Sequence, residues 1–255
     1  DIRLGRQRIN WGINLAWNPN DLFNAFNFLD FDYEERPGSD AVRVSYATGL
    51  MSNVEVAFAP ARDFSQSVGA AMYKFNVKGY DLQFLGGYAR CDLTLGAGWA
   101  GNIGKAGFKG EATWFEPTRH SPDSAGALSM SVAIDYLLSN GLYVSGAVLY
   151  NGLGESSGSG LQSGLAAANL SPKSLFPGKW ATLAQVSGQA TPLLSVSAAC
   201  IYSPTDNITV FFPSVSYSIR ENWDLDLIGQ TFFLDQPGGY GHAATAAFLR
   251  LKWSY

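Results

Sequence analysis

The strongest constraint on the fold is an alternation of apolar and polar residues that recurs along most of the chain. A period of two residues is typical of β-strands with one apolar face. The last nine residues divide in this way, with Leu249, Leu251, Trp253 and Tyr255 on one face and Arg250, Lys252 and Ser254 on the other. Strands that cross lipid must close on themselves, because hydrocarbon offers no partner for the backbone groups of an open sheet edge. The pattern therefore predicts an all-β fold, a transmembrane antiparallel β-barrel.

The composition supports a membrane domain built from strands. Charged residues make up only 15% of the chain and aromatic residues 14%. No apolar run reaches the roughly 18 residues that indicate a transmembrane helix. A soluble β-sandwich with a large core is the alternative. We expect a single domain over residues 1–255, since barrels of this length fold as one unit. The mild net charge of −4 gives no indication of nucleic acid as a partner.

About fourteen segments show the alternation, and we expect them to pair in up-and-down order. Each is close to the roughly 9–11 residues that a tilted membrane strand needs. They centre on residues 2–11, 41–48, 54–59, 68–77, 80–88, 93–101, 108–115, 128–138, 142–150, 180–190, 194–202, 208–219, 223–233 and 244–255. Pro213 interrupts the twelfth segment, where a β-bulge is the usual accommodation.

Two parts of the chain resemble bacterial outer-membrane proteins. The end of the chain is similar to the signal that the barrel-assembly machinery reads on the closing strand, which implies an assembly role for Leu249, Leu251, Trp253 and Tyr255. Residues 5–12 (GRQRINWG) and 17–23 (WNPNDLF) resemble a segment of porin-like barrels from Bacteroidota-type bacteria. In those proteins the segment lies well inside the chain. We therefore expect further residues upstream of Asp1, and a strand number that rises with them.

The resemblance implies a location in the bacterial outer membrane, with the lipid bilayer and lipopolysaccharide around the barrel, and passive transport. Outer-membrane barrels place short turns on the periplasmic side and long loops outside. Short and long connections alternate here, and the long ones cover residues 12–40, 61–67, 116–126, 151–179 and 235–243. The short link at residues 89–92 is the exception on the long-loop side. This order predicts that both termini are periplasmic.

Charged residues at inward positions of the strands are the candidate pore wall. By parity they include Arg43, Glu55, Lys74, Lys109, Glu111, Asp135 and Arg250. In a water-filled pore, mixed charges of this kind orient hydrophilic solutes. The alternative is a polar interior whose charges pair with one another and have no further role.

The first long loop, residues 12–40, is the candidate constriction. Pro19 after Asn18 predicts a short helix over residues 21–26. An acidic run follows and a basic ladder precedes the loop; these groups are Asp30, Asp32, Glu34 and Glu35, and Arg3, Arg6 and Arg8. A loop folded into the barrel would set the acids against the bases across the lumen. Its many aromatic residues favour this inward course over the alternative, an exposed loop with solvated charges.

Small residues predict open space beside the segments 142–150, 180–190 and 194–202. Their inward positions include Ser145, Ala147, Ala181, Ser187, Ser195, Ser197 and Ala199. Water or an inserted plug would fill such a space. The loop at residues 151–179, which is rich in Gly and Ser, is either that plug or a loop outside the barrel.

No catalytic group, metal site or cofactor is predicted. His120 and His242 are the only histidines and both fall on predicted loops, too far apart in sequence to form a recognisable metal site. The leading hypothesis is a porin-like channel for passive diffusion of small hydrophilic solutes. The alternative is a non-conducting barrel that anchors or scaffolds an outer-membrane complex, with other envelope proteins as partners.

Overall fold

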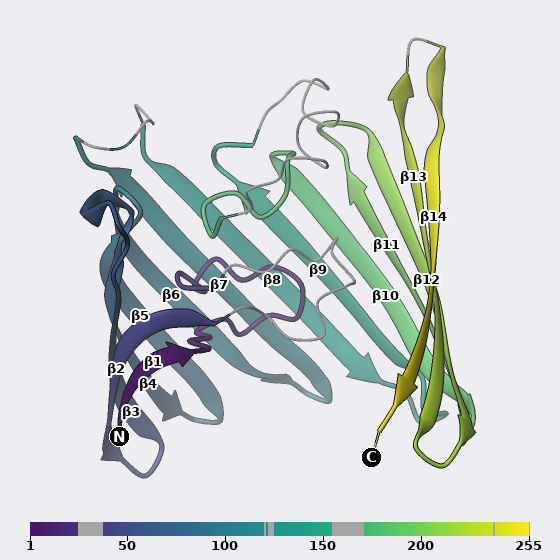
Figure 1. The fold of residues 1–255 in the computed structure, drawn as a ribbon, viewed down its shortest axis with the longest axis horizontal. Coiled ribbons are helices and arrows are strands. Elements are labelled where there is room, and N and C mark those ends of the chain that lie inside the picture. Colours follow the sequence, from purple (N-terminus) through teal and green to yellow (C-terminus); the bar gives the residue numbers. More distant parts are fainter. Residues whose placement is uncertain (25–37, 120, 122–124, 155–170, 237, 255) are drawn as a thin grey trace.

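The computed structural model describes residues 1–24, 38–119, 121, 125–154, 171–236 and 238–254. Fourteen strands form one antiparallel sheet in sequence order (Figure 1). They are β1 (Ile2–Gln7), β2 (Ser39–Gly49), β3 (Ser52–Ala59), β4 (Val68–Val77), β5 (Tyr80–Ala89), β6 (Asp92–Ile103), β7 (Ala106–Pro117), β8 (Ala127–Leu137), β9 (Tyr143–Asn151), β10 (Trp180–Thr191), β11 (Leu194–Ser203), β12 (Ile208–Arg220), β13 (Trp223–Gln236) and β14 (Gly239–Trp253). The predicted all-β, up-and-down architecture is confirmed.

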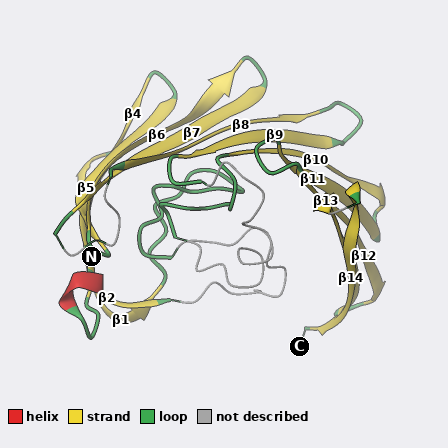
Figure 2. Cartoon of the chain, turned by 90° about the horizontal axis from the view of Figure 1, so that it is seen from above, coloured by secondary structure: helices red, strands yellow, loops and turns green. Residues whose placement is uncertain are grey.

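The sheet bends into an open ring, and connecting segments lie inside the ring (Figure 2). Side chains of a strand alternate between the two faces of the sheet. Leu85 and Glu111 on the inner face are buried, whereas Leu95 and Leu249 on the outer face are 71% and 72% exposed. An apolar face exposed to this extent is typical of a surface that contacts lipid or another protein.

The described residues contain a single short helix, the 3-10 turn η1 (Phe64–Gln66), between β3 and β4. Asp63 caps it, because its carboxylate accepts a hydrogen bond of 3.0 Å from the Ser65 backbone N–H. None of the helical residues described here forms a helix long and apolar enough to cross a membrane.

The strands lie close to their predicted positions, but two loop boundaries differ. The predicted loop at residues 235–243 is wrong, because β13 continues to Gln236 and β14 begins at Gly239. His242 therefore lies on a strand, paired with Phe233, and not on a loop. The first strand ends at Gln7 instead of residue 11, because the chain turns to the inner face at this point.

Pro213 lies in β12 without the predicted bulge. The pairing of β12 with β13 keeps one register from Phe211 to Ser214, and the register shifts only between Ser218 and Arg220. Gly229 stands opposite Pro213, and a Cβ atom at Gly229 would lie 2.9 Å from the proline Cγ. The missing side chain of Gly229 therefore makes room for the proline ring, and the register is the same on both sides of it.

The two ends of the sheet mark its open edges. In the described part of the chain, β1 pairs only with β2 and β14 only with β13. The chain ends flank the opening of the ring (Figure 2). An unpaired edge presents free backbone N–H and C=O groups. Closure of the ring in lipid requires that these groups of β1 and β14 find partners.

The room beside Pro213 gives a test of the fold. We expect Gly229→Val to lower the free energy of unfolding by about 1–3 kcal/mol, because an added side chain in a filled space forces its neighbours to shift. Urea unfolding of the protein in lipid vesicles measures the change. Gly146→Val on the outer face of β9 is the control, since its new Cβ would meet only the Leu183 carbonyl oxygen, at 3.6 Å. Equal losses in both variants would contradict the explanation.

Candidate functional site on the inner face

Residues 8–24, here called the inward segment, leave β1 and run along the inner face of the sheet (Figure 2). Ile9, Trp17 and Leu22 are buried to 1% exposure or less. The inward course predicted for the first long loop is thus found in the part of it that the structure describes. A segment without secondary structure must find partners for its backbone groups elsewhere, and side chains of the sheet supply them.

The predicted helix at residues 21–26 is not found. Pro19 and Asn20 form a turn, in which the Asp21 N–H donates to the Asn18 carbonyl at 3.1 Å, and residues 21–24 are not helical. Residues 25 and 26 lie outside the described residues. The side chain of Asn20 is held by the wall, since it donates to the Ala97 carbonyl and accepts from the Thr113 hydroxyl at 2.6 Å. These contacts to the sheet outweigh the local helix signal.

The carboxylate of Glu111, on β7, anchors the inward segment. It accepts hydrogen bonds from three backbone N–H groups, those of Ile13, of Asn14 at 2.8 Å and of Asn20 at 3.0 Å. Glu111 itself is fully buried. An ionised carboxylate is an acceptor only, which suits three converging donors. Glu111 therefore holds both ends of the stretch from residue 13 to residue 20 against the sheet.

A second acidic group, Glu55 on β3, holds the start of the same segment. It accepts a hydrogen bond of 2.5 Å from the Trp11 indole N–H and pairs with Arg43 of β2 at 2.5 Å. The Trp11 carbonyl accepts a hydrogen bond from the Gln83 side-chain amide at 2.8 Å. The Trp11 ring contacts the Phe23 ring edge-on. The predicted wall residues Arg43 and Glu55 are thus brought together, and Glu55 also binds the inward segment.

Residues 171–179, the second inward segment, pack on the first. The rings of Trp17 and Phe176 meet edge-on with centroids 6.4 Å apart. The side-chain amide of Asn151 donates to the carbonyls of Phe176 and Gly178 at 2.8 and 3.0 Å. The loop predicted as a candidate plug therefore lies on the inner side at its described end, while residues 155–170 lie outside the described residues.

A buried ion pair ties the second inward segment to the sheet. Lys173 lies 2.6 Å from Asp92 at the start of β6, and both residues are less than 10% exposed. Asp92 also accepts from the Ser121 hydroxyl at 3.0 Å. Breaking a buried pair by removing one partner is strongly destabilising, so this contact fixes the position of residues 171–173.

Other predicted wall charges pair across neighbouring strands. Lys109 and Asp135 form an ion pair of 3.0 Å, and Lys74 lies 3.7 Å from Asp81. Arg250 stands directly opposite Asp226 in the sheet register. These placements agree with the parity argument for an inner face of mixed charge.

The predicted basic ladder does not form on one face. Arg3 stands opposite Arg43 and pairs with Asp1 at 2.9 Å. Arg6 is on the other face of β1, with Asp40 at 2.9 Å, and Arg8 lies beyond the strand. Side chains alternate between the two faces along a strand, so residues 3 and 6 lie on opposite faces. The predicted ladder on one face is wrong for this reason. The acidic run Asp30, Asp32, Glu34 and Glu35 lies outside the described residues.

The proposed assembly residues lie along the edge strand β14. Leu249, Leu251 and Trp253 are more than half exposed on the outer face, and the Trp253 ring stacks on Trp223 at 5.9 Å. Tyr255 is outside the described residues.

Sequence reasoning missed the polar residues that hold the two inward segments. These include Asn20, Ser131 and Lys173; the Ser131 hydroxyl accepts from the Asn14 amide and donates to the Trp17 carbonyl. The available signal was the run of polar residues at inward positions of β6–β8. This pattern indicated a polar wall but did not predict which residue each polar side chain binds. Among the described residues, no three His, Cys, Asp or Glu side chains gather as a metal-binding group.

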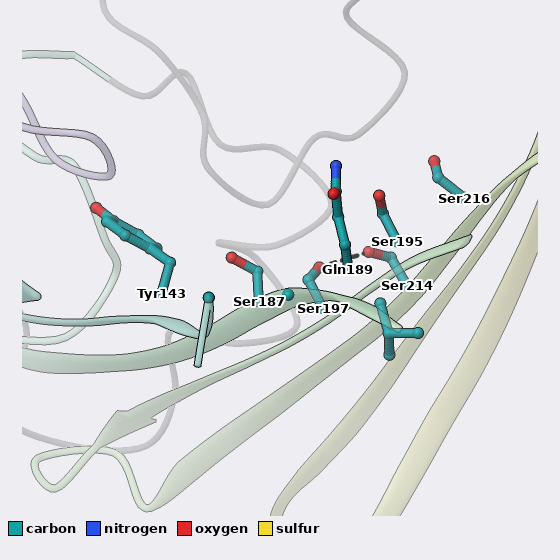
Figure 3. A pocket seen from close by; sticks show the side chains of 10 residues that line it. Tyr143, Ser187, Gln189, Ser195, Ser197, Ser214 and Ser216 are labelled. Carbon is teal, nitrogen blue, oxygen red and sulfur yellow. Dashed lines mark hydrogen bonds between the residues drawn. The ribbon is translucent and has the colours of Figure 1, made fainter. Parts of the chain in front are cut away.

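Part of the inner face carries small polar residues, as predicted. Ser187 of β10 and Ser195 and Ser197 of β11 line a hollow of about 430 Å³ (Figure 3). Ala181 and Ala199 are instead buried in an apolar cluster with Trp17 and Phe176. The small residues therefore serve two purposes, since some leave open space and others receive the inward segments.

Comparison with known proteins identifies the fold. No protein-family model and no curated protein matches the chain. OccK10 (OpdN) of Pseudomonas aeruginosa has a similar structure, with a TM-score of 0.60 and 14% identity over 91% of this chain and 76% of that one. The outer-membrane channel DcaP of Acinetobacter baumannii has a TM-score of 0.48 and 10% identity, over 88% of this chain and 89% of that one. The outer-membrane protein OmpT of Vibrio cholerae has a TM-score of 0.40 and 8% identity, over 83% of this chain and 85% of that one. The chain has the fold of a bacterial outer-membrane β-barrel.

Glu111 provides a test of how the inward segment is held. Glu111→Gln keeps the size of the side chain but turns an acceptor oxygen into an N–H donor that faces backbone donors. We expect a loss of about 1–3 kcal/mol, the cost of an unsatisfied buried group, and faster hydrogen exchange at residues 13, 14 and 20. Urea unfolding and hydrogen–deuterium exchange in lipid vesicles measure the two effects.

Glu116→Gln is the matched control on the same strand. Glu116 is exposed and accepts one hydrogen bond of 3.0 Å from the Trp114 indole, a role that the amide oxygen of Gln retains. Its exchange pattern should match that of the unchanged protein. Unaltered exchange at residues 13–20 in the Glu111 variant would remove Glu111 as the anchor.

Proposed function

We propose that this chain is a porin-like channel of the bacterial outer membrane, through which small hydrophilic solutes diffuse passively. The observation that carries the proposal is the unequal inner face. Two inward segments are bound to the wall at β2–β9, and a hollow with polar, uncharged walls lies along β9–β12. A pore that is narrowed on one side and polar on the other suits solutes that keep much of their hydration.

The outer face supports a membrane location. Large apolar side chains are exposed along it from one edge of the sheet to the other, from Leu4 at 74% to Leu251 at 57%. This surface suits the acyl chains of a bilayer, with lipopolysaccharide as a further neighbour, and a closing strand with exposed Leu and Trp suits the barrel-assembly machinery. An even number of antiparallel strands places both termini at one end of the sheet (Figure 1). With short turns on the periplasmic side, that end is periplasmic.

The constriction in this proposal is formed by the inward segment and the paired wall charges. Arg43 with Glu55, and Lys109 with Asp135, are ion pairs, so their fields largely cancel at a distance. We therefore expect weak discrimination between cations and anions. The acidic run at residues 30–35 remains a predicted second contributor.

A non-conducting barrel that anchors an envelope complex is the second candidate. The edge-on contact of Trp17 with Phe176 and the buried pair of Lys173 with Asp92 favour it, because they fix both inward segments inside the ring. Other envelope proteins would then be the partners.

Single-channel recording in planar bilayers decides between the two. Folded protein should give stable conductance steps if the polar side of the lumen is open. A preparation that is inserted and folded, as shown by its resistance to urea, but electrically silent would refute the channel and support the anchor.

The Lys109–Asp135 pair gives a sharper test of the pore wall. We expect Asp135→Asn to shift the reversal potential in a KCl gradient towards anions, because Lys109 loses its partner. Lys109→Gln should shift it towards cations. The double variant should return to the original value, since the net charge of the wall is restored. Identical reversal potentials in all four proteins would place this pair outside the ion path.

A further inference from the structure

Polar groups in the hollow stand in two rows across the strands. The sheet register places Tyr143, Ser187, Ser197 and Ser214 directly opposite one another in the first row. The second row holds Gln189, Ser195 and Ser216. Adjacent strands lie about 4.8 Å apart. The first row therefore presents a hydroxyl on each strand from β9 to β12, and the second row a hydroxyl or amide on each strand from β10 to β12 (Figure 3).

Several of these groups are available to a ligand. The hydroxyls of Ser197 and Ser214 bond to each other at 2.6 Å, and this contact orients them. Among the described residues, the side chains of Ser187, Gln189 and Ser195 have no hydrogen-bond partner. Ser187 is partly buried, and Gln189 and Ser195 are exposed, so all three face space that water or a solute can enter.

The hollow is electrically neutral. None of its lining residues in the described part of the chain is charged. The nearby charges are compensated: Lys109 pairs with Asp135, and Asp226, which accepts from Ser216, stands opposite Arg250. A charged solute would give up hydration here without meeting an opposite charge, which is unfavourable.

We infer that this hollow is a binding site for a neutral polyhydroxylated solute of the sugar class on its way through the barrel. The inference rests on the proposed channel function. A hydroxyl both donates and accepts hydrogen bonds, so rows of Ser hydroxyls with one Gln amide match a ligand that carries several hydroxyls. The Tyr143 ring at the end of the first row adds an apolar surface with a polar tip, which suits the C–H face of a sugar ring.

The test compares three sugars of similar ring size and different charge. Glucose, glucuronate and glucosamine are added in turn to single channels in planar bilayers, and interruption of the ion current measures binding. We expect glucose to bind most strongly. Stronger binding of glucuronate or of glucosamine would overturn the neutral assignment.

The hydroxyls themselves are tested by the triple variant Ser187→Ala, Ser195→Ala and Ser197→Ala. It removes three uncharged hydroxyls without narrowing the pore, so the variant should still conduct, and its block by glucose can be compared with that of the unchanged protein. Glucose binding should weaken at least about tenfold, since each hydrogen bond contributes modestly and three are lost. Thr182→Val is the control, because this hydroxyl of β10 lies on the outer face and donates to the Tyr202 carbonyl. Unchanged glucose binding in the triple variant would overturn the site.

Failure of the channel and failure of the site are distinguishable. If the folded protein passes no current, the channel proposal falls, and glucose binding is then measured by calorimetry on the protein in detergent. Binding that the triple variant loses supports the site without the channel. No binding in that measurement overturns the site as well.

Discussion

The hydrogen bonds between Glu111 and the inward segment determine the shape of the lumen. A chain without secondary structure enters the interior of a barrel only if its backbone groups find partners there. The buried carboxylate satisfies three N–H groups at once; Glu55 holds the segment before them, and Ser131 holds it between them. This attachment decides which part of the wall is covered.

The attachment divides the lumen into two unlike parts. Beside the inward segments, aromatic and aliphatic groups such as Trp17, Phe176 and Leu149 form a packed cluster. Along β9–β12, Ser and Gln side chains line the hollow. In the proposed channel, the packed side would give a constriction its rigidity, and the polar side would give water and solutes a path. The polar side is the basis of the proposed channel, and the two inward segments packed inside the ring explain why a non-conducting anchor is the competing proposal.

Much of the fold could be predicted because strand patterns are local. The strand at residues 68–77 was predicted with its observed bounds, and the inward parity of Glu55 and Glu111 was correct. The candidate site was predicted less well. Arg3 and Arg6 lie on opposite faces of β1, because side chains alternate along a strand, so the expected basic ladder does not form on one face. Pro213 needs no bulge, because Gly229 on the neighbouring strand gives it room.

The sequence by itself determined most of the strands and the face that most of their side chains occupy, because alternation along a strand directly sets which side a residue is on. Only the tertiary structure decided which segment fills the lumen and which wall it covers. Glu111 meets the backbone of Asn14, and Lys173 meets Asp92, across 97 and 81 residues of sequence. Such contacts depend on how the curved sheet brings distant strands around one interior, and no local pattern carries that information.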